Sequence, residues 1–219
     1  MENVTDRTSN PFGMRPPCEA PCSADVPAVF GYGDANADFH VVGDHPGVHG
    51  GRETGVPFAG TEAGTAIRRT LHGADFLDDP NADEPTLENC FLSYLHMCCP
   101  PKSRDPDPER YADLEPFFDA ELRAIAAHVL VPVGERATRH VIETYTARAS
   151  KLEIEMTTLH ATEIRGSGFL IVPVRDPLGW DEDDADALVE RLLSIRGRDY
   201  RETADLSRFL GTDELYYVR

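Results

Sequence analysis

The sequence predicts an α/β fold of three layers, α/β/α, around a central, largely parallel sheet of four strands. Short apolar, β-prone runs alternate with longer segments that have helical periodicity. Hydrophobic residues make up 41% of the 219 positions, which is enough for one core of good size. Loops rich in glycine and proline follow several of the runs. In such folds ligands bind at the carboxyl ends of the strands, so these loops are where we expect the functional site.

The N-terminal half predicts an arm, two strands and a helix. Residues 1–26 are proline-rich, lack periodicity and are expected to form an extended arm. The run 39–43 is the first strand, and the apolar run 90–97 is a second, buried strand. Between them, 61–74 has apolar residues at helical spacing, and Thr61 is suited to cap its N-terminus.

The C-terminal half continues the alternation. The expected elements are a helix over 108–128, a strand at 129–133, a helix over 135–146, two strands within 158–174 joined by a Gly-Ser-Gly turn, and a helix over 183–195. Pro108 suits the first turn of its helix. The folded domain is therefore expected to cover 27–197, with 198–219 as a polar tail.

The composition is strongly acidic, with a formal charge of -18. Such a charge argues against nucleic acid as a partner, because binding phosphates calls for Lys and Arg. Only Lys102 and Lys151 are lysines, however, and the acids are spread along the chain, as is typical of a salt-loving cytoplasm. We therefore expect a halophilic protein, in which salt screens the charge and the net charge excludes no partner.

The chain has no apolar run of 18 or more residues and no apolar signal core near its start. We expect a cytoplasmic protein without a membrane partner. The five cysteines are an odd number, and disulfides are not expected in the cytoplasm. The cysteines are either small buried hydrophobes or part of a metal site.

The loop after the first strand contains five glycines between Gly47 and Gly60. Glycine loses more backbone entropy on folding than any other residue, so this loop is costly to order. Such loops are typical of places where the backbone approaches a ligand.

Several separated segments carry a resemblance to a known family. Gly31, Gly33 and Ala37 precede the first strand. The other segments, in order, are Gly-Asp-His-Pro-Gly at 43–47, Gly-Val-Pro-Phe-Ala-Gly-Thr-Glu-Ala-Gly at 55–64, the stretch 98–118 that begins Cys-Cys-Pro-Pro, and Val-Leu-Val-Pro-Val-Gly-Glu-Arg-Ala at 129–137. Together they resemble the uracil-DNA glycosylase superfamily, nearest its thermostable iron–sulfur branch, over roughly residues 18–195.

The resemblance implies hydrolysis of the N-glycosidic bond of a damaged base that is flipped out of DNA. It implies that Asp44 positions water or balances the sugar's positive charge, and that Phe58 stacks on the base. The alternatives are a loop-capping Asp44 and a core Phe58. His49 is expected in solvent. The loop residues implied to surround the base are Gly43, His45, Pro46 and Gly47.

Two departures from the family pattern bear on catalysis. Tyr94 stands where the family has a base-reading Asn; a phenol lacks the amide's donor–acceptor pair for uracil, and its bulk would fill the pocket. Asp176 stands where the family has a His that donates to the leaving base. An ionised Asp there opposes the reaction by about 4 kcal/mol at an effective dielectric near 20, unless it is protonated or Arg175 donates instead. A turn residue before Pro177 is the other interpretation of Asp176.

A third departure concerns a cofactor. The branch holds a [4Fe–4S] cluster with four cysteines. Cys18, Cys22 and Cys98 match three of them, but Leu114 occupies the fourth position. We therefore expect no cluster unless another side chain supplies the missing ligand. The candidates for that ligand are Cys90, Cys99 and His96.

Two functions remain open. The first is a monomeric enzyme that removes a damaged base, uracil or another, from DNA, with Arg52, Lys102 and Arg104 near the phosphate backbone. The second is a catalytically disabled glycosylase-fold protein that binds nucleic acid or nucleotides. Tyr94 and Asp176 favour the second on physical grounds. A nucleotide-handling α/β protein is a third reading, against which the lack of a full phosphate-loop signature argues.

Overall fold

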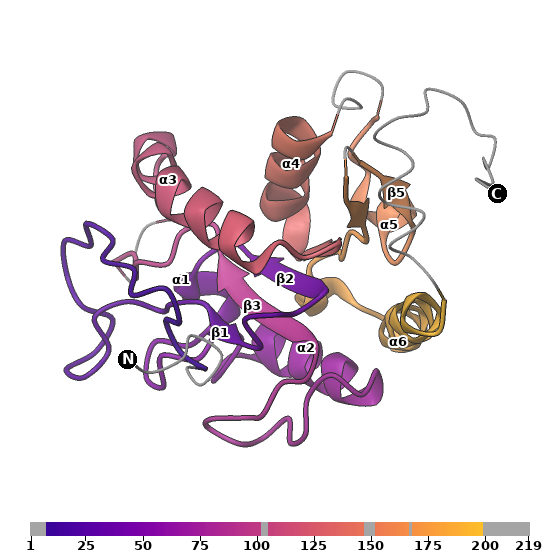
Figure 1. Ribbon diagram of the computed structural model, residues 1–219, viewed down its shortest axis with the longest axis horizontal. Helices are drawn as coiled ribbons and strands as arrows, with labels where there is room; N and C mark the ends of the chain where they lie inside the picture. Colours follow the sequence, from indigo (N-terminus) through magenta and orange to yellow (C-terminus); the bar gives the residue numbers. More distant parts are fainter. Residues whose placement is uncertain (1–7, 102–104, 147–151, 167, 199–219) are drawn as a thin grey trace, which may run out of the picture.

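The computed structural model describes residues 8–101, 105–146, 152–166 and 168–198 (Figure 1). Its single sheet has the strand order β1-β3-β2-β4-β6-β5. The four inner strands are parallel neighbours: β3 (Cys90–Tyr94), β2 (Phe39–Gly43), β4 (Val129–Pro132) and β6 (Leu170–Ile171). The two edge strands, β1 (Tyr32–Gly33) and β5 (Ile164–Arg165), pair antiparallel with their neighbours. The largely parallel sheet is thus confirmed, but among the described residues it has six strands rather than four, because a two-residue strand is added at each edge.

Helices cover both faces of the sheet. Figure 1 shows α2 (Glu62–Gly73) and α6 (Glu182–Arg196) on one side, and α3 (Pro108–Ile125) and α4 (Gly134–Tyr145) on the other. Alternation along β2 explains the layers, since Val41 packs into the core shared with α2 and α6 while Val42 packs into the core shared with α3 and α4. The three-layer α/β/α prediction is confirmed. The short helices are α1 (Pro46–His49), α5 (Met156–Leu159) and the 3₁₀ turn η2 (Pro177–Gly179).

The helix starts follow local sequence chemistry. The Thr61 hydroxyl accepts a hydrogen bond from the Gly64 N–H at 3.1 Å, which confirms the predicted cap of α2. Asp107 caps α3 in the same way, with Pro108 in the first turn. This helix ends three residues earlier than predicted, because Ala126 adopts a left-handed φ of 53°.

Strand β3 ends at Tyr94 rather than at residue 97. The next two backbone N–H groups, of Leu95 and His96, donate to the carbonyls of Gly43 and Asp44, each at 3.0 Å. The chain leaving β3 is therefore tied to the loop that leaves β2. This pairing brings the two predicted site loops together at one edge of the sheet.

The described part of the arm, from residue 8, runs along the domain without helix. The Val29 N–H donates to the Met97 carbonyl at 2.9 Å, which holds the end of the arm beside the loop after β3. Two disulfides join the same segments, Cys18–Cys98 and Cys22–Cys99, with Cα–Cα distances of 5.4 and 5.0 Å. The expectation that this chain lacks disulfides is therefore wrong, because the fold places four cysteines that are distant in sequence within bonding range.

Two further expectations from the sequence concern a membrane-spanning helix and the C-terminal tail. Across the described ranges, no helix is both long and apolar enough to cross a bilayer. The predicted tail, apart from Arg198, lies outside the described residues.

Candidate functional site

The centre of the site is Asp44, directly after β2. The Tyr111 hydroxyl, from α3, donates to Asp44 Oδ1, and Arg136 Nε, from α4, lies 3.3 Å from Oδ2. The Arg136 guanidinium also lies over the Tyr111 ring, with Cζ 4.6 Å from the ring centroid. The Asp44 side chain is 16% exposed. The three side chains therefore fix the orientation of one carboxylate at the carboxyl edge of the sheet.

Tyr111 is suited to be the donor in this arrangement. Burial and the negative charge of Asp44 raise its pKa, so the phenol keeps its proton. Tyr111 and Arg136 were not identified from the sequence. Tyr111 lies 67 positions from Asp44 in the sequence. No local sequence pattern indicates that a tyrosine on one helix and an arginine on the next contact the same carboxylate.

His49 is buried rather than in solvent, which corrects the sequence expectation. It is 2% exposed and ends the short helix α1, which turns the loop back toward β2. Its Nδ1 accepts a hydrogen bond from the Asp44 backbone N–H at 3.0 Å, so the ring proton is on Nε2. Burial lowers the pKa of His49 to about 4, although the charges of Asp44 and Asp176 oppose this. Pro46, in the first turn of α1, was the one sequence signal for this turn.

Three rings pack together beneath Asp44, and we call His49, Phe58 and Tyr94 the ring cluster. Their centroids are 5.4 Å apart for His49 and Phe58, 5.3 Å for Phe58 and Tyr94, and 6.2 Å for His49 and Tyr94. None is more than 2% exposed. A Cβ on Gly43 would lie 2.6 Å from a Tyr94 ring carbon and 2.8 Å from Phe58 Cζ, so glycine is required there.

The Tyr94 hydroxyl fixes the ring cluster. It accepts from the Phe58 N–H at 2.7 Å and donates to the Gly50 carbonyl at 3.1 Å. Phe58 has a left-handed φ of 61°, uncommon for a bulky residue, and the Tyr94 bond satisfies its buried N–H. Asp44 and Phe58 thus both contact His49, but the rings of His49 and Tyr94 occupy the space beside Phe58. The stacking role of Phe58 remains a prediction.

The remaining loop residues shape the backbone. His45 is buried and caps α1, with Nδ1 accepting from the Gly47 N–H at 3.0 Å. A Cβ on Gly47 would lie 2.7 Å from the His45 ring, so the pair needs glycine. His45 Nε2 lies 3.7 Å from Asp105 Oδ1. His45 is therefore a capping residue in this structure, and its contact with a base remains a prediction.

Asp176 has the geometry of a turn residue. It is exposed and precedes η2, and its carboxylate accepts from the Leu178 N–H at 3.0 Å. Its charge nevertheless reaches His49. Arg175 is not available as a substitute donor, because its guanidinium forms an ion pair with Asp184 at 2.8 Å.

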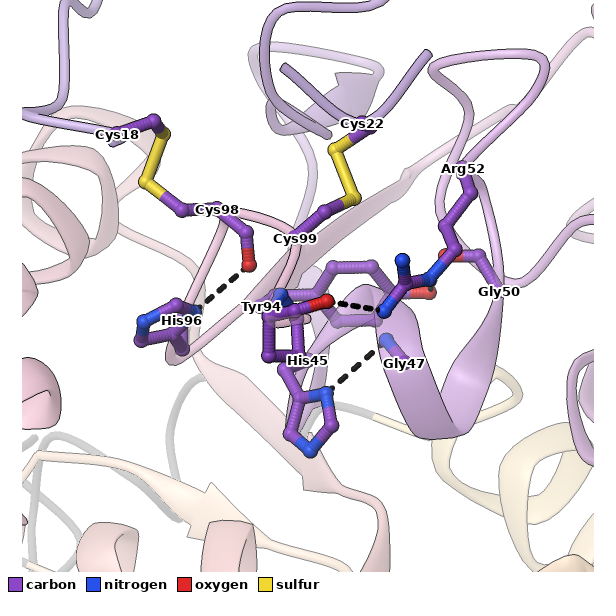
Figure 2. Close-up of a disulfide and its surroundings, with 11 residues drawn as sticks. Cys18, Cys22, His45, Gly47, Gly50, Arg52, Tyr94, His96, Cys98 and Cys99 are labelled. Atoms are coloured by element: carbon purple, nitrogen blue, oxygen red, sulfur yellow. Dashed lines mark hydrogen bonds between the residues drawn. A yellow bond between two sulfur atoms is a disulfide. The ribbon is translucent and has the colours of Figure 1, made fainter. Parts of the chain in front are cut away.

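One of the three predicted backbone-binding residues is described. Arg52, labelled in Figure 2, is half-buried, and its Nη2 donates to the Pro100 carbonyl at 2.6 Å. It therefore ties the loop after β2 to the loop after β3. Lys102 and Arg104 lie outside the described residues.

The structure places Cys99, a candidate for the missing iron–sulfur cluster ligand, with Cys18, Cys22 and Cys98, and all four are bonded to one another in pairs; the expectation of no cluster stays a prediction. Such a cluster needs four thiolates, but Cys18, Cys22, Cys98 and Cys99 are all used in the two disulfides (Figure 2). Leu114 is buried and packs with Cys98 and Cys18. Cys90 is free and buried at the start of β3. Across the described ranges, no group of three or more His, Cys, Asp or Glu side chains is arranged to hold a metal ion.

Comparisons with known protein sequences point to one family. The family model of the uracil DNA glycosylase superfamily matches residues 30–185. The type-4 uracil-DNA glycosylase of Saccharolobus solfataricus is 24% identical over 150 residues, 68% of this chain and 65% of the relative. The type-5 enzyme of Thermus thermophilus is 30% identical over 126 residues, 56% of this chain and 57% of the relative. The type-5 enzyme of Pyrobaculum aerophilum is 25% identical over 171 residues, which is 76% of this chain and 73% of the relative.

The chain thus spans less than two thirds of the length of the first two of these relatives. The family model, in contrast, covers well over half of the chain, from just before β1 into α6. It includes the loops that carry Asp44, the ring cluster and Asp176. The chain belongs to the uracil-DNA glycosylase superfamily.

Proposed function

We propose that this chain is a glycosylase-fold protein that binds DNA and does not excise uracil. The observation that supports this is Tyr94, whose ring packs against Phe58 and Gly43 where the family reads the base with an amide. Its hydroxyl is used on both sides by backbone groups, and its ring is 1% exposed. No edge of this side chain is available to a uracil.

Moving Tyr94 aside to admit a base is costly. The Phe58 N–H and the Gly50 carbonyl would both lose a partner in a buried place, at about 1–3 kcal/mol each. Asp176 adds an electrostatic barrier, because an exposed carboxylate repels a base that leaves as an anion. The two effects act on different steps, base entry and bond cleavage, and both oppose uracil removal.

A second candidate function is excision of a different damaged base from DNA. Asp44 favours it, since Tyr111 and Arg136 hold its carboxylate in one orientation, which positioning of water requires. In this case the base would be one that needs no amide reader. DNA with a damaged base is the partner in both candidates, and a salt-rich cytoplasm is the setting that we propose from the composition.

A gain-of-function experiment tests the proposal. Oligonucleotides with a single uracil are incubated in 2 M KCl with the unsubstituted chain, Tyr94→Asn, and Tyr94→Asn combined with Asp176→His, and abasic-site cleavage is measured. We expect no product from the unsubstituted chain. We expect product from the double variant, up to about fivefold faster than from Tyr94→Asn alone, because repulsion by an exposed, salt-screened carboxylate amounts to at most about 1 kcal/mol.

The controls separate the two candidates. Asp44→Asn in the double variant should abolish the gained activity, and thermal melts verify that each variant is folded. Removal of uracil by the unsubstituted chain would show the proposal to be wrong. Release of hypoxanthine or xanthine by the unsubstituted chain, but not by Asp44→Asn, would establish the second candidate.

A further inference from the structure

Two covalent links join the arm to the loop after β3. Cys18 and Cys22, three residues apart in the arm, bond to the adjacent residues Cys98 and Cys99 (Figure 2). The links close 80 and 77 positions of sequence. One disulfide would leave the arm free to pivot about a single bond, whereas two side by side fix its direction. We call this pair of disulfides the clasp.

The clasp is connected to the site by hydrogen bonds. The Cys98 carbonyl accepts from His96 Nδ1 at 2.8 Å, and the His96 ring packs edge-on against Tyr111 with centroids 5.4 Å apart. Two residues further on, the Pro100 carbonyl accepts a hydrogen bond from the Arg52 guanidinium. The loop that carries the clasp therefore also orients the His96 ring, which packs against Tyr111. The same loop binds Arg52, which lies in the loop after β2.

The clasp is accessible to small thiols. Cys18, Cys22 and Cys99 are only partly buried, whereas the unpaired Cys90 is 0% exposed. A hollow of about 490 Å³ lies against the clasp and is lined by Cys18, Cys98 and Cys99 together with Arg52 and His96. Access of this kind is what thiol–disulfide exchange requires.

We propose that the clasp replaces an iron–sulfur cluster as the link between the arm and the site, and that it is a redox switch. When oxidised, it holds the arm on the loop after β3 and keeps Arg52 bonded to Pro100. When reduced, it releases the arm and leaves this loop free to move. The inference is independent of which base, if any, the protein removes.

The chemistry is ordinary exchange with a small thiol or disulfide. A thiolate bonds to one sulfur of the clasp, the S–S bond breaks, and the electron pair leaves with the second sulfur, which takes up a proton. A second small thiolate then bonds to the sulfur of the first, the bond between that sulfur and the protein cysteine breaks, and the cysteine leaves with the electron pair and takes up a proton. Each disulfide thus gains two electrons and two protons, and two molecules of the small thiol become one disulfide. Oxidised glutathione reverses both steps.

Thiol counting tests whether the clasp forms. The full chain is purified without reductant, denatured in iodoacetamide and weighed by mass spectrometry. We expect one alkylated cysteine, Cys90, and five after treatment with dithiothreitol. We also expect no iron, no acid-labile sulfide and no absorbance near 400 nm. Iron with sulfide, or five reactive thiols before reduction, would overturn the proposal.

Limited proteolysis tests whether the clasp is a switch. A glutamate-specific protease is used to cut after Glu19, which is exposed between the two arm cysteines. We expect reduction to accelerate this cut about tenfold or more, since a released arm reaches the protease without wider unfolding. Oxidised glutathione should restore the slow rate.

Two variants serve as matched controls. Cys90→Ser removes the free thiol but not the clasp, so its cleavage should still respond to dithiothreitol. The combined Cys18→Ser and Cys22→Ser variant should be cut rapidly with or without reductant. Equal cleavage of the oxidised and reduced unsubstituted chain would show that the clasp does not control the arm.

Discussion

Glu121 gives a prediction that can be worked out in detail. It lies on α3, is 0% exposed, and faces Gly31, where a Cβ would lie 2.1 Å from its Oε1. Within the described ranges neither carboxyl oxygen has a well-aligned hydrogen bond, although the Gly31 N–H and the Ser93 hydroxyl lie toward it. Burial raises the pKa of Glu121 from 4.5 to about 8. The carboxyl is therefore neutral in the folded protein at neutral pH.

The sign of the pH effect follows from proton counting. Between pH 4.5 and about 8 the folded chain holds a proton on Glu121 that the unfolded chain has lost, so the free energy of unfolding decreases as pH rises. Over this window the decrease is up to about 5 kcal/mol, at 1.36 kcal/mol for each pH unit. Glu121→Gln removes this contribution and keeps the shape of the side chain.

At lower pH, a buried histidine changes the free energy of unfolding with pH in the opposite direction to Glu121. His40 Nε2 is 2.6 Å from Ser93 Oγ, and burial lowers the pKa of His40 from 6.5 to about 3. Between these values the unfolded chain binds the extra proton, so this histidine makes the free energy of unfolding increase with pH. The two slopes cancel between pH 4.5 and 6.5, and a net loss of about 2 kcal/mol remains from pH 6.5 to 8.

Urea unfolding at constant 2 M KCl measures this effect. The free energies of unfolding of the unsubstituted chain and Glu121→Gln are compared at pH 5.5, 6.5, 7.5 and 8.5. From pH 6.5 to 8, the free energy of unfolding of the variant should rise by about 2 kcal/mol relative to that of the unsubstituted chain. Glu115→Gln, at an exposed position on the same helix, is the control and should show no such trend. A constant difference between Glu121→Gln and the unsubstituted chain at all four pH values would refute the argument.

Three further outcomes are expected. Tyr94→Phe should lower the free energy of unfolding by about 2–4 kcal/mol in urea, because two buried backbone groups lose their partner; a change below 0.5 kcal/mol would contradict the bonds described. Gly43→Ala should cost about 1–3 kcal/mol in the same assay, since its Cβ would collide with two rings, and stability equal to that of the unsubstituted chain would mean that the ring cluster yields easily. Raising KCl from 0.1 to 2 M should raise Tm by roughly 4–8 °C in calorimetry, as screening about 2 kcal/mol of repulsion would do; an unchanged Tm would count against the halophilic interpretation.

The edge strand β1 and the cysteines show where sequence reasoning stops. The two-residue strand β1 is too short to have a recognisable alternation, so only its pairing in the sheet defines it, whereas β5 and β6 lie where two strands were predicted within 158–174. The disulfides were excluded on the basis of cellular location, which contains no information about distance. The fold, by crossing the arm over the loop after β3, brings the four cysteines together.

The sequence by itself determined the layers of this protein. The apolar run 39–43, the glycines of the loop after it and the Thr61 cap act over a few residues, and such local preferences can be read directly. Only the tertiary structure decided the partners of Asp44, the burial of His49, the closed ring cluster and the neutral Glu121. Each of these depends on side chains from separate elements meeting at a particular angle, and that angle is set by packing of the whole core rather than by any local pattern.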